Sequence, residues 1–184
     1  MTFKVTEINH RCWPNEALVG QALGTFGLSI EQLQQSLRDF VHSRAVDPNR
    51  GFQQDLAEAL KQHLGEYLGR AANLRIADSR YSPKLNEEAD LALGPNNTGP
   101  RLFIEVEFRP NVEKDLVKFQ IGANTGALGV AILVLTLDRN NINRSYTTMP
   151  EYSKFVRLIE ELRPSYPLLM LGFKGTHSDV KVPT

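Results

Sequence analysis

Apolar residues recur with the period of an α-helix in the first part of the chain. They do so over residues 31–41, and Ser29 with Gln32 has the spacing of a capping box at the start of that helix. A longer helix is predicted over residues 52–68, where apolar side chains form a continuous stripe. The pattern therefore predicts an N-terminal helical segment over residues 1–48. It is followed by a core in which the spacing of apolar residues changes from the helical period.

The period shortens to two residues after the second helix, which is the alternation typical of β-strands. In residues 101–108 every even-numbered side chain is apolar, and residues 129–137 are apolar almost throughout, as expected of a strand buried on both faces. Because a helix is predicted between these two strands, they should be parallel neighbours with a right-handed crossover. The sequence thus predicts an α/β fold with a mixed central β-sheet flanked by helices. The other predicted elements are the helices 112–124 and 150–162 and the strands 73–77, 88–93 and 168–173.

Composition narrows the class of protein. A chain of 184 residues is the size of a single domain spanning residues 1–184. Its 21 basic and 21 acidic side chains cancel, which excludes a strongly cationic protein that grips nucleic acid by charge alone. No apolar run is long enough for a membrane span, and the lone Cys12 has no partner for a disulfide. We therefore expect a soluble, cytoplasmic protein with no membrane partner.

Carboxylates gather on two of the predicted strands. Glu105 and Glu107 lie on one face of their strand, about 7 Å apart along it. Asp90 lies on the preceding strand, and the loop 94–100 between the two is rich in proline, glycine and asparagine. Such a loop would make the strands antiparallel neighbours about 4.8 Å apart. In a suitable register, Asp90 and Glu105 converge on one point.

Converging carboxylates repel one another unless a positive charge lies between them. A hard cation such as Mg²⁺, bound through oxygen ligands, is the natural occupant. It can polarise a phosphoryl oxygen and activate water, as phosphodiester hydrolysis requires. The carbonyl of Val106 is a further possible ligand, and Glu107 could orient the attacking water or hold a second metal ion.

These residues resemble a known nuclease motif. Asp90, fourteen intervening residues and then Glu105-Val106-Glu107 are similar to the PD-(D/E)xK motif, in the form found in the restriction endonucleases BamHI, BglII and BstYI, which has an acid at the usual lysine position. The resemblance extends over about residues 50–175, which would be the catalytic core of a restriction-endonuclease-like fold. It implies that Asp90 and Glu105 bind Mg²⁺ together with the Val106 carbonyl, and that Glu107 is also catalytic. The chain departs from the motif at Ala89, where the family has proline.

The resemblance also points to DNA contacts. Related restriction enzymes place base-reading residues in the loop after the buried strand, and here that loop, residues 138–146, is rich in arginine and asparagine. The side chains of these two residue types match guanine and adenine edges. A plain polar loop is the alternative for any one of them. The candidate DNA-binding residues are Arg109, Asn111, Arg139, Asn140, Asn143 and Arg144.

The first helix of the core also carries acids. Asp55 and Glu66 both flank the apolar stripe of the helix 52–68, whereas Glu58 is expected to point the opposite way. Either flanking acid would be a candidate to join the site, and the alternative is an ordinary solvated helix flank.

The leading hypothesis is a Mg²⁺-dependent type II site-specific endonuclease that cleaves double-stranded DNA. Because one chain carries one site, we expect a homodimer on a palindromic target. The N-terminal helices, up to Val41, are candidates for the dimer interface or for flanking the DNA. Two alternatives stay open: a repair or junction nuclease of the same fold, and a non-catalytic binding module.

Overall fold

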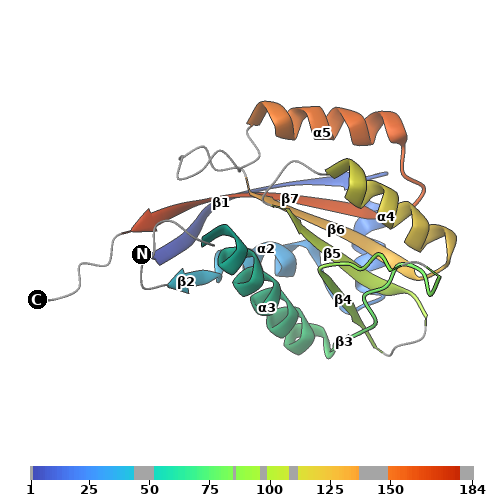
Figure 1. Ribbon diagram of the computed structural model, residues 1–184, viewed down its shortest axis with the longest axis horizontal. Coiled ribbons are helices and arrows are strands. Elements are labelled where there is room, and N and C mark those ends of the chain that lie inside the picture. Colours follow the sequence, from blue (N-terminus) through green and yellow to red (C-terminus); the bar gives the residue numbers. More distant parts are fainter. Residues whose placement is uncertain are drawn as a thin grey trace, which may run out of the picture.

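Seven strands form one mixed sheet in the computed structural model, and helices cover both of its faces (Figure 1). The structure describes residues 2–43, 52–84, 86–95, 99–107, 112–136 and 149–178. The strands are β1 (Thr2–Trp13), β2 (Val41–Ser43), β3 (Arg75–Ile76), β4 (Leu91–Gly94), β5 (Arg101–Glu107), β6 (Leu128–Thr136) and β7 (Leu168–Ser178). The helices are α1 (Glu16–Gly24), α2 (Ile30–Arg38), α3 (Phe52–Ala72), α4 (Val112–Asn124) and α5 (Met149–Leu162).

The strand order is β2-β1-β7-β6-β5-β4-β3. Strands β5, β6 and β7 are mutually parallel, and the other neighbouring pairs are antiparallel. Helix α4 connects β5 to β6, and α5 lies between β6 and β7 in the sequence. The predicted parallel pair, its helical crossover and the α/β fold class are therefore confirmed.

Two apolar cores lie on the two faces of the sheet. On one face α1, α2 and α3 pack against side chains such as Leu102 and Ile104 of β5. On the other face α4 and α5 cover Phe103 of the same strand. Strand β6 contributes to both cores, with Ile132 in the first and Leu133 in the second. The central strands are apolar on both sides because both faces of the sheet are covered by helices.

The N-terminal segment differs from the expectation. The prediction that residues 1–48 are helical is wrong for β1 and β2, and the helix predicted over residues 31–41 ends at Arg38. Strand β1 pairs antiparallel with β2 and, along its length, with β7. Buried apolar residues alternate with exposed ones in β1 only at Phe3 and Val5. A bulge follows Val5, and most of the next residues are polar and at least partly exposed. The pairing with β7, which the local pattern does not encode, explains the strand. It also explains why β7 runs to Ser178 instead of ending at residue 173.

Several local predictions are confirmed. The Ser29 side chain accepts a hydrogen bond from the Gln32 backbone N–H, and the Gln32 side chain accepts one from the Ser29 backbone N–H, which completes the capping box of α2. Helix α4 has the predicted bounds, whereas α3 ends at Ala72, beyond the predicted end at residue 68. Within the described parts of the chain, no helix combines the length and the apolarity that crossing a bilayer requires.

Candidate active site

Asp90 and Glu105 meet where β4 begins beside β5. Leu91 of β4 pairs with Ile104 of β5, so Asp90 lies one position before the paired region and opposite Glu105. The backbone nitrogen of Asp90 is 3.4 Å from Glu105 Oε2, and Asp90 Oδ2 accepts a hydrogen bond of 2.8 Å from the backbone N–H of Val106. The structure thus places side by side the two carboxylates that the sequence predicts to converge.

Glu105 is buried and strongly bonded at one of its two oxygens. The residue is 1% exposed. Its Oε1 accepts a hydrogen bond of 2.7 Å from the Tyr81 hydroxyl and one of 2.9 Å from Lys118 Nζ. Burial, followed by the nearby charge of Asp115, raises the pKa of Glu105 to about 7, although both hydrogen bonds act in the opposite direction. This carboxyl group therefore binds protons much more readily than an exposed glutamate.

Glu107 faces an acid of helix α4. Asp115 is 1% exposed, and its side chain lies close enough to Glu107 for a carboxyl–carboxyl hydrogen bond. Burial, and then the charge of Glu107, raise the pKa of Asp115 to about 7. Burial also raises the pKa of Glu107, with the charges of Asp90 and Glu105 acting in the same direction. Asp90, Glu105, Glu107 and Asp115 together form what we call the carboxylate cluster.

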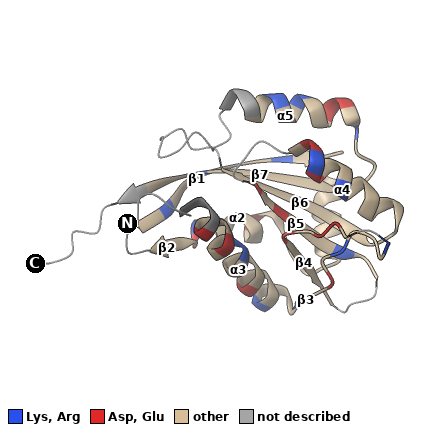
Figure 2. Ribbon diagram, in the orientation of Figure 1, with Lys and Arg blue, Asp and Glu red and all other residues tan. Residues whose placement is uncertain are grey.

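A lysine from each helical layer contacts the carboxylate cluster. Lys61 of α3 places its Nζ 2.9 Å from Asp90 Oδ1, and Lys118 of α4 lies 3.4 Å from Asp115 Oδ1 besides bonding Glu105. Burial by itself lowers the pKa of both lysines, but their bonds to carboxylates raise it overall, so both are charged. Figure 2 shows charged residues of both signs on α3 and α4 and acidic residues on β5. The site therefore contains built-in countercharges.

Tyr81, Lys61, Asp115 and Lys118 were not candidates in the sequence. Asp115 and Lys118 are three residues apart on α4, each one position before a residue of its apolar stripe, and this is the one signal that could have identified them. The Tyr81 ring stacks on Phe103 at a centroid distance of 4.6 Å, and nothing in the periodicity marks it. These contacts join segments far apart in the chain.

Glu58 of α3 is linked to the site through Lys61, whose Nζ is 2.9 Å from Glu58 Oε1 as well as from Asp90 Oδ1. The Glu58 side chain is 68% exposed, as expected of a position opposite the apolar stripe. Glu66 instead accepts a hydrogen bond from the Gln62 side chain. A role for Asp55 stays a prediction. Because lysine has a long side chain, Lys61 on the flank of the stripe can reach Asp90.

The predicted DNA contacts lie outside the described residues. This holds for all six candidates, which are Arg109, Asn111, Arg139, Asn140, Asn143 and Arg144.

The donor chemistry of the carboxylate cluster fits a hard divalent cation. Four carboxylates face two ammonium groups, which leaves two negative charges when all are ionised. Carboxylate oxygens are the ligands that Mg²⁺ prefers, and one or two of them suffice when water and phosphate complete its coordination shell. No group of three or more His, Cys, Asp or Glu within the described ranges is positioned to hold a metal ion by itself. The residues present therefore fit a Mg²⁺ ion that is held by one or two protein carboxylates and completed by other oxygen ligands.

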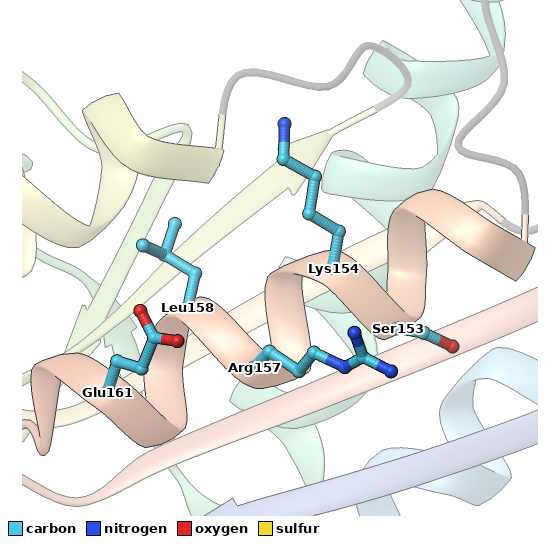
Figure 3. A pocket seen from close by; sticks show the side chains of 5 residues that line it. All are labelled: Ser153, Lys154, Arg157, Leu158 and Glu161. Atoms are coloured by element: carbon cyan, nitrogen blue, oxygen red, sulfur yellow. The ribbon is translucent and has the colours of Figure 1, made fainter.

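Two surface pockets lie away from the carboxylate cluster. One, of about 480 Å³, follows the outer side of α5, where Lys154 and Arg157 extend from the helix beside Leu158 (Figure 3). The other, of about 530 Å³, lies between the end of β1 and the end of α5, and includes Arg11 and Arg163. Among the described residues, neither pocket contains a member of the cluster. The carboxylate cluster, where β4 begins beside β5, lies outside both pockets.

The architecture is a restriction-endonuclease-like fold. No protein-family model and no curated protein matches the chain. The crystal structure of restriction endonuclease BglII complexed with a DNA 16-mer is similar with a TM-score of 0.54 at 16% identity, covering 96% of this chain and 81% of that one. The structure of free BglII has a TM-score of 0.48 at 12% identity, covering 96% of this chain and 82% of the other. At these identities the likeness concerns the fold.

Proposed function

We propose that the protein is a Mg²⁺-dependent type II endonuclease that cleaves double-stranded DNA at a specific sequence. One observation carries the proposal: Asp90 and the buried Glu105 lie against each other on neighbouring strands of a restriction-endonuclease-like sheet. Carboxylates on such a rigid strand edge are held in place for metal-assisted chemistry. The similar fold of BglII, which has been crystallised with DNA, supports DNA as the substrate class.

In this proposal each residue has a distinct role. Asp90 and Glu105 hold Mg²⁺, together with the Val106 carbonyl, and Glu107 orients the attacking water. When bound, the metal ion polarises the phosphate and favours deprotonated water. Lys118 fixes Glu105 through Oε1, and Lys61 holds Asp90 through Oδ1. The two lysines also supply positive charge beside the place where a DNA phosphate would lie.

Sequence recognition and symmetry complete the proposal. Arginine and asparagine side chains pair with guanine and adenine edges, so the loop after β6 is proposed to read the bases. Its candidates are Arg139, Asn140, Asn143 and Arg144, whereas Arg109 and Asn111 are proposed to contact the backbone near the cleaved bond. One site per chain supports a homodimer that cuts both strands of a palindrome.

The test is to incubate the purified protein with long, unmethylated duplex DNA in Mg²⁺ or in EDTA and to separate the products on a gel. We expect discrete fragments that require the metal, and sequencing of their ends identifies the target. Cutting confined to branched or junction substrates would instead establish a repair or junction nuclease. Metal-independent binding of DNA without cleavage of any substrate would leave a binding module and overturn the proposal.

A further inference from the structure

Hydrogen-bond donors are unequally distributed over the carboxylate cluster. Asp90 has a donor at each oxygen, Lys61 at Oδ1 and the backbone N–H of Val106 at Oδ2. Glu105 has two donors at Oε1 and a longer contact from the Asp90 backbone at Oε2. Asp115 differs, because its Oδ2 is buried and, among the described residues, has no hydrogen-bond partner.

The buried oxygen of Asp115 belongs to a carboxyl group that faces another acid. Its neighbour is Glu107, and neither carboxylate can donate a hydrogen bond to the other when both are ionised. Lys118 reaches only Oδ1 of Asp115, at 3.4 Å, and is held more closely by Glu105 at 2.9 Å. Asp115 is buried and Glu107 is only partly exposed, so these two facing carboxylates need either a shared proton or a cation between them.

We propose that Glu107 and Asp115 bind a divalent cation of the hard, oxygen-preferring class, Mg²⁺ or Mn²⁺, at a position separate from the one proposed at Asp90 and Glu105. Two carboxylates, completed by water, form the kind of site that Mg²⁺ uses in proteins. The Oδ2 of Asp115, which is buried and has no hydrogen-bond partner among the described residues, supplies one ligand atom. For its role in catalysis this inference rests on the proposed nuclease function, whereas binding of the cation does not require DNA.

The arrangement predicts which of the two proposed cation sites is occupied first. A cation at Asp90 must compete with the ammonium group of Lys61, which lies 2.9 Å from Oδ1. A cation between Glu107 and Asp115 displaces no donor at Oδ2, and it relieves the repulsion between the two acids. In the absence of DNA, the tighter cation site should therefore depend on Asp115 and not on Asp90.

The test uses Mn²⁺ as the probe and the full-length chain without DNA. Free Mn²⁺ is followed by its electron paramagnetic resonance signal during a titration of the wild type and of Asp115→Asn, Glu107→Gln and Asp90→Asn. We expect the tightest site of the wild type to weaken at least about tenfold in the first two variants and to persist in Asp90→Asn. Glu113→Gln, an exposed position on the same helix, serves as the matched control and should bind as the wild type does.

Thermal unfolding in EDTA shows whether each variant is folded. Asp115→Asn should also unfold at a higher temperature than the wild type in EDTA, because the amide removes a buried like charge and can donate to Glu107. Unchanged Mn²⁺ binding by folded Asp115→Asn and Glu107→Gln would overturn the proposal, as would a wild type that binds no Mn²⁺. Cleavage is measured separately, so a protein that binds Mn²⁺ through Asp115 but cuts no DNA would refute the nuclease function and keep the cation site.

Discussion

Strand β5 carries a buried ionisable residue near each end, Arg101 at one and Glu105 at the other. The surroundings of these two ends shift carboxyl pKa values in opposite directions. At the first end, Arg101 is 8% exposed, donates a 2.6 Å hydrogen bond to the Asp78 carbonyl, and places its guanidinium 5.1 Å from the centre of the Phe103 ring. There, hydrogen bonds from Arg80 lower the pKa of the Asp78 carboxyl to about 2. At the other end, burial raises the pKa of Glu105 to about 7.

The difference lies in the ratio of acids to bases. At the Arg101 end two arginines surround one carboxylate, Asp78, so its ionised form is stabilised. At the Glu105 end carboxylates outnumber lysines and are shielded from water, so ionisation is costly. The first arrangement holds more basic than acidic groups, whereas the second holds more acidic than basic groups. Such perturbed groups are typical of functional sites, although structural ion pairs can also produce them.

The largest expected effect is on cleavage. Glu105→Ala should lower the rate of DNA cleavage in Mg²⁺ about a thousandfold or more, because it removes a proposed metal ligand. Asp78→Ala, at the opposite end of β5, should leave the rate within about threefold. Single-turnover cleavage of a duplex that contains the target site measures both. A Glu105→Ala variant that cuts at the wild-type rate would refute the metal-site assignment.

The second effect is on the pH dependence of stability. The folded-state pKa of Glu105, about 7, exceeds the ordinary 4.5, so the folded protein keeps a proton that the unfolded chain has already lost. The free energy of unfolding should therefore fall as pH rises from about 4.5 to 7, by about 3 kcal/mol if Glu105 acts alone. Asp78 has the opposite sign, because its contribution is lost as pH falls from 3.8 towards 2.

Urea denaturation in EDTA across this range measures the slope. Glu105→Gln should make the decline between pH 4.5 and 7 shallower without abolishing it, because the pKa of Asp115 is also raised, and should leave the acid limb, where Asp78 titrates, as in the wild type. A decline that is equally steep in Glu105→Gln would show that other groups cause it.

The smallest expected effect is a difference in the loss of stability between two variants. One removes Lys118, beside Glu105, and the other removes Arg80, beside Asp78. Lys118→Met should destabilise the metal-free protein by about 2 kcal/mol at pH 8, because it leaves Glu105 and Asp115 ionised without their shared partner. The loss should shrink at pH 5.5, where these acids are protonated. Arg80→Met breaks an exposed pair and should lower the urea midpoint less than Lys118→Met does. Equal losses for the two variants would mean that burial of the Lys118 pair has no energetic consequence.

The sequence predicted the core elements because their patterns are local. The alternation of residues 101–108, the apolar run of β6 and the period of α4 each depend on neighbours a few positions away. Strand β1 was missed because what holds it is β7, about 160 residues further along the chain.

The candidate site divides in the same way. The sequence by itself predicted two neighbouring strands on which Asp90 and Glu105 can converge in a suitable register, and the observed pairing of Leu91 with Ile104 provides that register. Only the tertiary structure decided what surrounds them. Lys61 arrives on a helix from one face of the sheet, and Asp115 and Lys118 arrive on a helix from the other. No local period encodes the docking of one helix against one strand, and that docking determines which oxygens of these carboxylates have a hydrogen-bond partner.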